Sequence, residues 1–194
     1  MSERRHIATL ATAMVIGLAA TSVTLLHAQS KSGDLTADSR FIREAASDNL
    51  LEIRLGQMAE KQGTNAEVKQ FGQRMITDHT TMQNQWVNLA AKGGLTLKPA
   101  LGRRHEQKVD RLEKLSGKKF DQAYITSIVQ NERDDVDYFE NESKSAHSAQ
   151  VRDLAANDLR TLQQDLTQAK EIGSKVGADT TAKRSRHITA SKTK

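Results

Sequence analysis

The chain has 194 residues, of which 37% are hydrophobic and only 4% aromatic, with a single Pro and a net charge of +5. This length fits one domain with appendages, and a middle region rich in Ala, Gln, Glu, Lys and Leu favours long helices over sheet. Because the sequence contains no Cys, it excludes a disulfide framework and a thiolate metal site.

The N-terminus has the order of an export signal. Arg4 and Arg5 precede an uncharged run from Ile7 to Leu26, and Ala28 comes just before a polar stretch. We expect cleavage after Ala28, which makes residues 1–28 a signal peptide and residues 29–37 a linker. The uncharged run is also long enough to span a hydrocarbon core of about 30 Å, so an uncleaved N-terminal anchor is the alternative. Either way, the protein is predicted to be exported and periplasmic or envelope-associated.

The positive charge is concentrated at the C-terminus. Residues 174–194 hold six Lys or Arg against one Asp, and residues 1–28 carry +1, which leaves the middle with −1 of the total +5. The C-terminal segment lacks hydrophobic periodicity, so we predict a disordered basic tail. A solvated tail without a partner is the simplest interpretation. Binding to an anionic surface or to another envelope protein is the alternative, and no nucleic-acid partner is expected.

Hydrophobic residues recur at helical spacing in four long segments, at about 38–62, 64–92, 118–145 and 148–173. Thr64 and Glu67 have capping-box spacing at the start of the second segment, and Ser148 is a candidate cap for the fourth, which we expect to end near Gly173. The second segment has the clearest apolar stripe, at steps of three and four: Val68, Phe71, Met75, His79, Met82, Trp86 and Leu89.

The connections between these segments predict the topology. The first two segments and the last two are joined by only a few residues, whereas residues 95–117 form a long connection with Pro99 and a short helix at about 103–115. Short, long and short connections are typical of a bundle with one crossover. We therefore predict an all-α fold, a ferritin-like four-helix bundle over residues 38–173, with one longer crossover that contains a short helix.

A polar residue lies near the midpoint of each long segment: Glu52, His79, Asn131 and Asp165. Midpoints of helices of similar length lie at one level of a bundle, so these side chains are expected to meet in the core. They offer a mixed oxygen and imidazole set that suits one hard or borderline divalent ion. The predicted metal ligands are Glu52, His79, Asp165 and Glu132, with Asp135 as an alternative to Glu132. A hydrogen-bonded polar layer without metal is the other interpretation.

Three neighbouring side chains have simpler expected roles. Asp78 is adjacent to His79 and points about 100° away from it on a helix, so both cannot easily bind one ion. Tyr124 is expected to point inward with its hydroxyl hydrogen-bonded. Asp121 is expected to face the positive end of its own helix.

Three segments resemble an exported bacterial family of ferritin-like domains of unknown function: FIREAASDNLLE (41–52), MITDH (75–79) and LSGKKFDQAY (115–124). The likeness spans about residues 41–173. It implies a periplasmic or envelope-associated helical bundle, often described as a predicted outer-membrane protein, without a set reaction. In such relatives a His is expected where this chain has Asn131 and again where it has Asp165, so only His79 remains of that set.

No nucleophile elbow, phosphate-binding loop, Rossmann glycine pattern or zinc-protease helix occurs in the sequence. We therefore predict a non-catalytic envelope protein with a binding or stress-related role. The alternative is a metal-binding or oxidoreductase bundle with a degenerate site.

Overall fold

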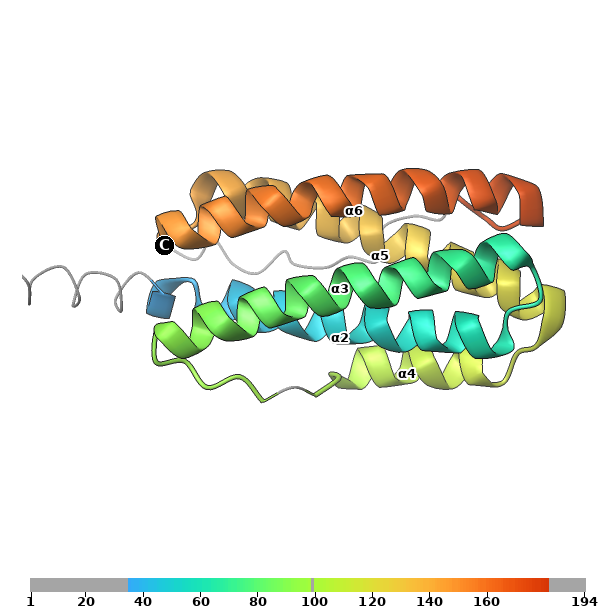
Figure 1. The fold of residues 1–194 in the computed structure, drawn as a ribbon, viewed down its shortest axis with the longest axis horizontal. Helices are drawn as coiled ribbons and strands as arrows, with labels where there is room; N and C mark the ends of the chain where they lie inside the picture. The colour runs from blue at the N-terminus through green and yellow to red at the C-terminus, as the bar shows by residue number, and fades with distance from the viewer. Residues whose placement is uncertain (1–34, 99, 182–194) are drawn as a thin grey trace, which may run out of the picture.

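The computed structural model describes residues 35–98 and 100–181, and this part of the chain is helical with no strand. Four long helices, α2 (Ser39–Gln62), α3 (Ala66–Lys92), α5 (Gly117–Ser145) and α6 (Ala149–Val176), accompany the shorter α4 (Arg103–Glu113) (Figure 1). The predicted all-α class is confirmed. The predicted signal peptide and residues 182–194 of the predicted tail lie outside the described residues. Within them, no helix combines the length and hydropathy needed to cross a bilayer.

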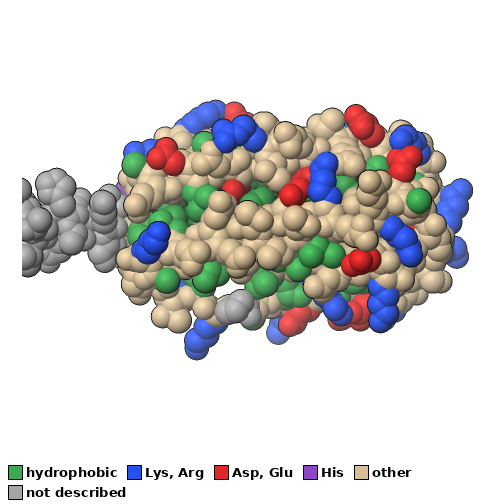
Figure 2. All heavy atoms as spheres, viewed as in Figure 1, with side chains coloured by type: hydrophobic (Ala, Val, Ile, Leu, Met, Phe, Trp, Pro, Cys, Tyr) green, Lys and Arg blue, Asp and Glu red, His purple; other side chains and the backbone are tan. Residues whose placement is uncertain are grey.

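The four long helices form two antiparallel hairpins. α2 pairs with α3 and α5 pairs with α6, while α2 packs on α5 and α3 packs on α6. The connection between the hairpins runs back along α2 and carries α4, which contacts α2 and α5 (Figure 1). The connections thus have the predicted short, long and short lengths. On the face drawn in Figure 2, Lys and Arg are interspersed with Asp and Glu, in keeping with the nearly neutral middle of the chain.

Two glycines let α2 and α3 approach closely. A Cβ atom at Gly56 would lie 2.7 Å from the carbonyl oxygen of Gly72, and a Cβ atom at Gly72 would lie 2.8 Å from that of Gly56. Distances this short leave no room for a side chain at either position. The contact therefore fixes how α2 lies against α3, in the part of the hairpin between the polar midpoints and the α2–α3 turn.

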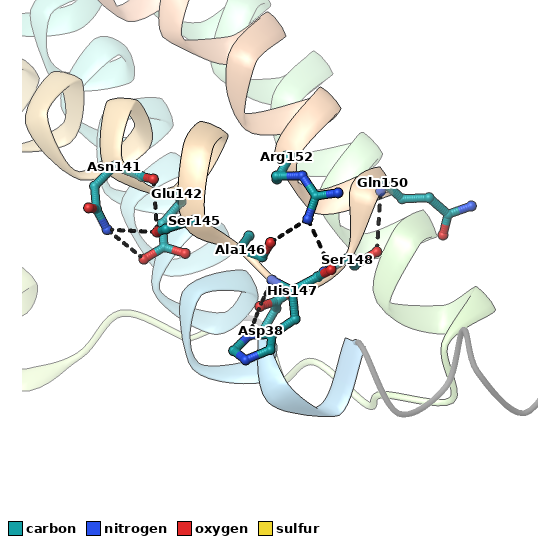
Figure 3. A network of polar contacts seen from close by, with 9 residues as sticks. All are labelled: Asp38, Asn141, Glu142, Ser145, Ala146, His147, Ser148, Gln150 and Arg152. Carbon is teal, nitrogen blue, oxygen red and sulfur yellow. Dashed lines mark hydrogen bonds and ion pairs between the residues drawn. The ribbon is translucent and has the colours of Figure 1, made fainter. Parts of the chain in front are cut away.

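Each interhelical turn is held by an aspartate from the opposite hairpin. The buried Asp38, before α2, accepts hydrogen bonds from the backbone N–H groups of His147 (2.9 Å) and Ser148 (2.8 Å) in the α5–α6 turn (Figure 3). Asp121, just past the first turn of α5, accepts from the backbone N–H of Thr64 (3.0 Å) and from its hydroxyl (2.6 Å) in the α2–α3 turn. Asp121 therefore stabilises a distant turn, which corrects the prediction that it serves its own helix.

Two helix ends differ from the predicted ones because of tertiary contacts. The Thr64 hydroxyl bonds to Asp121, so the cap of α3 is Asn65, whose side chain accepts from the N–H groups of Glu67 and Val68. Ser148 caps α6 as predicted, accepting from the N–H of Gln150. α6 runs past Gly173 to Val176 and ends at Gly177, whose φ of 75° lies in the left-handed region that favours glycine. The helix thus extends three residues beyond the predicted bundle boundary.

The apolar core consists of two clusters, one toward each end of the bundle. One contains Leu55, Phe71, Tyr124 and Ile172, and the other contains Phe41, Trp86, Phe139 and Val151. Along every long helix, a buried polar residue lies between the two clusters: Asn49 in α2, followed one turn later by Glu52, His79 in α3, Glu132 in α5 and Asp165 in α6. A polar layer therefore divides the core near its middle.

Candidate metal centre

The polar layer brings together side chains from all four long helices. Glu52 is 1% exposed, His79 is 1% exposed, and Glu132 and Asp165 are 0% exposed. One ligand atom from each of His79, Glu132 and Asp165 lies within 4.8 Å of the others. Of the four predicted midpoint residues, His79 and Asp165 belong to this set. Asn131 instead donates to Glu52, and Glu132 faces His79 in its place.

His79 presents a free nitrogen to two carboxylates. Its Nδ1 lies 2.8 Å from the side-chain oxygen of Asn49, an atom that can only accept, so Nδ1 carries the hydrogen. The other ring nitrogen, Nε2, lies 3.6 Å from Oε1 of Glu132 and 3.7 Å from Oδ2 of Asp165. These separations exceed hydrogen-bond length. Nε2 therefore faces two acidic side chains at distances beyond hydrogen-bond length.

Most of the inward-facing atoms of the layer have no hydrogen-bond partner among the described residues. These atoms are His79 Nε2, both carboxyl oxygens of Glu132, Oδ2 of Asp165 and Oε2 of Glu52. Buried polar groups are normally paired, and buried carboxylates need a compensating cation or a proton. Among the described residues, the layer is therefore not a fully paired hydrogen-bonded network.

The geometry fits a single divalent cation. Zinc-type ions bind imidazole nitrogen and carboxylate oxygen at about 2.0–2.2 Å, which separates tetrahedral ligand atoms by about 3.4 Å. The separations of 3.6 and 3.7 Å around Nε2 are close to this value. Bundle sites for two metals add a Glu three residues before the helix-borne His. Ile76 and Leu162 occupy the positions three residues before His79 and Asp165, so the set suits one ion.

Arg74 orients Asp165. Its guanidinium donates to Oδ1 of Asp165, lies 3.6 Å from Oδ2 of Asp78, and stacks over the ring of Phe71 at 5.6 Å from the centroid. This contact leaves Oδ2 of Asp165 directed at His79. Asp78 is half-buried and lies beside Arg74, away from the centre, as the divergence of adjacent helical residues predicts.

A chain of hydrogen bonds connects the centre to α4. The Asn131 side chain donates to Oε1 of Glu52 at 2.6 Å, and the Lys108 ammonium of α4 donates to the side-chain oxygen of Asn131. The pKa of Lys108 lies below its ordinary value because burial lowers it, and the charges of Glu52 and Asp135 oppose this effect only in part. Asp135 is half-buried and lies toward Lys108, so Glu132 and not Asp135 faces His79.

Burial shifts the carboxyl groups of the centre toward their protonated forms. It raises the pKa of Glu52 from the ordinary value of 4.5 to about 8, with the charge of Glu132 adding to the effect. Burial, followed by the charge of Asp165, raises the pKa of Glu132 well above its usual range. Burial also raises the pKa of Asp165, but His79 and Arg74 oppose this. Protons therefore occupy part of the centre at neutral pH when no other cation is bound.

Two further buried side chains border the centre. Tyr124 stacks on Phe120, with 5.9 Å between ring centroids, and its hydroxyl has no partner among the described residues, which corrects the prediction of a hydrogen bond. Burial, then the charges of Glu52, Glu132 and Asp165, raises the pKa of Tyr124. Asp158 accepts a 2.7 Å hydrogen bond from Nε1 of Trp86.

The family model described as Domain of unknown function (DUF4142) matches residues 24–172, more than half of the chain. The chain belongs to this family. The predicted domain-of-unknown-function family is thereby confirmed. No curated protein and no solved structure matches the chain.

Three polar residues around the centre of this DUF4142 domain were not among the predicted site residues: Asn49, Arg74 and Lys108. Asn49 lies three residues before Glu52, on the same face of α2, so its helical spacing was a usable signal. Arg74 lies off the apolar stripe of α3 and reaches the layer only through its long side chain. Lys108 belongs to α4, and no periodicity in the sequence indicates which long helix α4 would contact.

Proposed function

We propose that this protein is an exported, envelope-associated helical bundle that binds one divalent metal ion without catalysing a reaction. The observation that carries the proposal is the free Nε2 of His79 between Glu132 and Asp165, at 3.6 and 3.7 Å, in a fully buried layer. Two carboxyl oxygens and one imidazole nitrogen converging without hydrogen bonds are a ready set of metal ligands. Glu52 is the fourth candidate ligand, through its unpaired Oε2.

Charge balance supports a divalent ion. Arg74 already compensates Asp165, so Glu52 and Glu132 are the two acids left without a fixed cation inside the layer. Burial raises the pKa of Glu52 to about 8 and raises the pKa of Glu132 well above its usual range, so in the metal-free protein both groups are shifted toward their protonated forms. One divalent ion that displaces two protons leaves the net charge of the buried layer unchanged. Such an exchange avoids the cost of burying uncompensated charge.

Burial supports a binding role and not a catalytic one. Sites in which the ion is enclosed by protein are typical of structural or storage functions, whereas catalytic sites keep a position open to substrate. Each predicted ligand here is no more than 1% exposed. The donor set of imidazole and carboxylate suits zinc, manganese or ferrous iron.

The remaining parts of the proposal come from topology and from the N-terminal sequence. Two antiparallel hairpins joined by one long crossover are the arrangement of ferritin-like bundles, and we propose that this domain is one of them. Export is proposed from Arg4 and Arg5 followed by the uncharged run to Leu26. Mass spectrometry of protein recovered from a bacterial envelope fraction tests export, because an intact Met1 would contradict cleavage after Ala28.

Metal titration tests the central claim. Metal-free protein is titrated by calorimetry with Zn(II), Mn(II) and Fe(II), and one ion per chain with a dissociation constant below micromolar is expected. His79→Ala should lose this ion and keep its helicity by circular dichroism, whereas His147→Ala, which changes an exposed His outside the centre, should keep it. The proposal fails if the wild-type protein binds none of the three ions more tightly than micromolar.

A further inference from the structure

A groove with a volume of about 540 Å³ lies between α4, α5 and the segment that follows α6. Small-molecule sites in proteins typically have volumes of about 300–1,000 Å³. None of the four proposed metal ligands lines this groove, so it is separate from the proposed metal centre. Hydrogen bonds hold its third wall: the Gln122 side chain donates to the Val176 carbonyl at 2.9 Å, and the Thr126 hydroxyl accepts from the backbone N–H of Asp179 at 3.1 Å. The groove is therefore formed by contacts within the protein itself.

One end of the groove is polar. Ser127 lines it and is only 8% exposed, and its hydroxyl has no hydrogen-bond partner among the described residues. Buried hydroxyls are normally paired, so this one points to a ligand. α4 and α5 are antiparallel (Figure 1), and Lys108 of α4 contacts Asn131 of α5. Arg111, one turn further along α4, is therefore close to the level of Ser127, one turn before Asn131. Two cations and an unpaired hydroxyl are thus brought to the same end of the groove.

The other end of the groove is apolar. Leu112 and Leu115 of α4 and Ala123 of α5 line it toward the start of α5. Leu115 and Ala123 pack against the core but are only partly buried, so they leave apolar surface accessible in the groove. The lining residues of α5 extend from Lys119 to Gln130, which corresponds to about 16 Å along the helix axis. The groove is thus elongated and suits a linear ligand with one polar end and one apolar end.

The charge of the groove favours a negatively charged ligand. Lys108, Arg111 and Lys119 line it together with a single acid, Asp179. Oδ1 of this acid already accepts from the backbone N–H and from the hydroxyl of Thr181, each at 2.8 Å. Residues 182–194, which follow this wall in the chain, carry five Lys or Arg and no acid. Their charge has the same sign as that of the groove, so charge complementarity favours an external anion over this segment as the occupant.

We infer that the groove binds a medium-chain fatty acid, with its carboxylate at the polar end and its alkyl chain at the apolar end. The guanidinium of Arg111 and the ammonium of Lys108 are donors that suit a carboxylate, and the Ser127 hydroxyl adds a third. The alkyl chain covers apolar surface that the fold leaves accessible. None of the residues that line the groove is aromatic, so a nucleotide would find no ring on which its base could stack. Binding of the fatty acid does not require the proposed metal ion, because the two sites share no residue.

Calorimetry of the full chain tests the site with decanoate, decanol and acetate, in the presence of a metal chelator. One decanoate per chain should bind with a dissociation constant below about 0.1 mM. Decanol has the same alkyl chain without the charge and should bind at least about tenfold more weakly, because it cannot make charge-assisted hydrogen bonds. Acetate has the carboxylate without the chain and should show no binding under the same conditions.

Three variants locate the site. Arg111→Gln should weaken decanoate binding about tenfold and Ser127→Ala about fivefold, because each removes a donor to the carboxylate. Arg104→Gln is the matched control, since it removes an exposed charge from the same helix outside the groove, and its affinity should stay within about twofold of wild type. Circular dichroism checks that each variant is folded.

Three results would overturn the fatty-acid site: no saturable decanoate binding by the wild-type chain, equal binding of decanol and decanoate, or wild-type affinity in both Arg111→Gln and Ser127→Ala. Each of these results would leave the proposed metal centre standing, because that centre is tested separately by metal titration of the wild-type chain.

Discussion

Replacing Glu52 by Gln should make the metal-free protein more stable at neutral pH, although it alters a buried residue near the centre of the core. The wild-type carboxyl is 1% exposed, and its pKa is raised by burial and by Glu132 to about 8. A group with a raised pKa in the folded state opposes folding once the unfolded chain ionises. Through Glu52, the free energy of unfolding is therefore highest below pH 4.5 and falls as the pH rises toward 8.

The size of the effect follows from the same two values. Between pH 4.5 and pH 7 the unfolded carboxyl is ionised while the folded one remains largely protonated. Each pH unit in this window is worth about 1.4 kcal/mol, so the wild-type protein loses about 3 kcal/mol of unfolding free energy through Glu52 by pH 7. A glutamine keeps the acceptor for Asn131 and does not ionise. The amide group of the glutamine, which has no partner, replaces a carboxyl oxygen that has none either. The unfolding free energies of wild type and Glu52→Gln should therefore agree within about 1 kcal/mol at pH 5.

Urea denaturation, followed by circular dichroism in the presence of a chelator, measures this difference at pH 5, 6, 7 and 8. The advantage of Glu52→Gln should grow with pH and reach about 3 kcal/mol at pH 7. Glu60→Gln is the matched control, because Glu60 is exposed on the same helix, and it should show no such pH-dependent gain. An equal pH slope for wild type and Glu52→Gln, or lower stability of Glu52→Gln at pH 7, would refute the reasoning.

Three further predictions follow from the described contacts. Zn(II) binding at pH 7 should release protons, because burial raises the pKa of Glu52 to about 8 and raises the pKa of Glu132 well above its usual range; calorimetry in buffers of different ionisation enthalpy counts them, and release of none would contradict the exchange. The emission of Trp86, the single tryptophan, should titrate near pH 6 with Asp158, and Asp158→Asn should abolish that transition and raise stability at pH 7 by about 3 kcal/mol. Gly72→Ala should destabilise by about 2 kcal/mol or more in thermal unfolding, since its Cβ would contact Gly56 at 2.8 Å, and an unchanged midpoint would count against that packing.

Helical periodicity predicted the long elements because each carries an apolar stripe that the bundle buries. The stripe of α3 is the clearest case, since Val68, Phe71, Met75, His79 and Trp86 are all buried. The end of α6 could not be predicted in this way. Gly173 resembles a stop signal, yet it is buried inside the helix and packs against Thr180, a contact that depends on how the chain folds back after Gly177.

The centre was predictable in position but not in its connections. Near-equal helix lengths put Glu52, His79 and Asp165 at one level, and this required no knowledge of side-chain conformation. Which nitrogen of His79 is free depends on Asn49, and which oxygen of Asp165 is free depends on Arg74. Both choices follow from the rotation of neighbouring helices, which the sequence does not specify.

The polar layer has a cost that an ion can offset. Apolar residues at Glu52 and Glu132 would join the two hydrophobic clusters into one core, and replacing buried charged groups in this way is often stabilising. The protein instead keeps two acids that lower its stability as the pH rises toward 7. A ligand at a hundred times its dissociation constant adds about 2.7 kcal/mol to the folded state, close to the roughly 3 kcal/mol lost through Glu52 alone. If the proposed ion binds, its occupancy therefore adds about the stability that the layer removes and couples the folded state to the concentration of that ion.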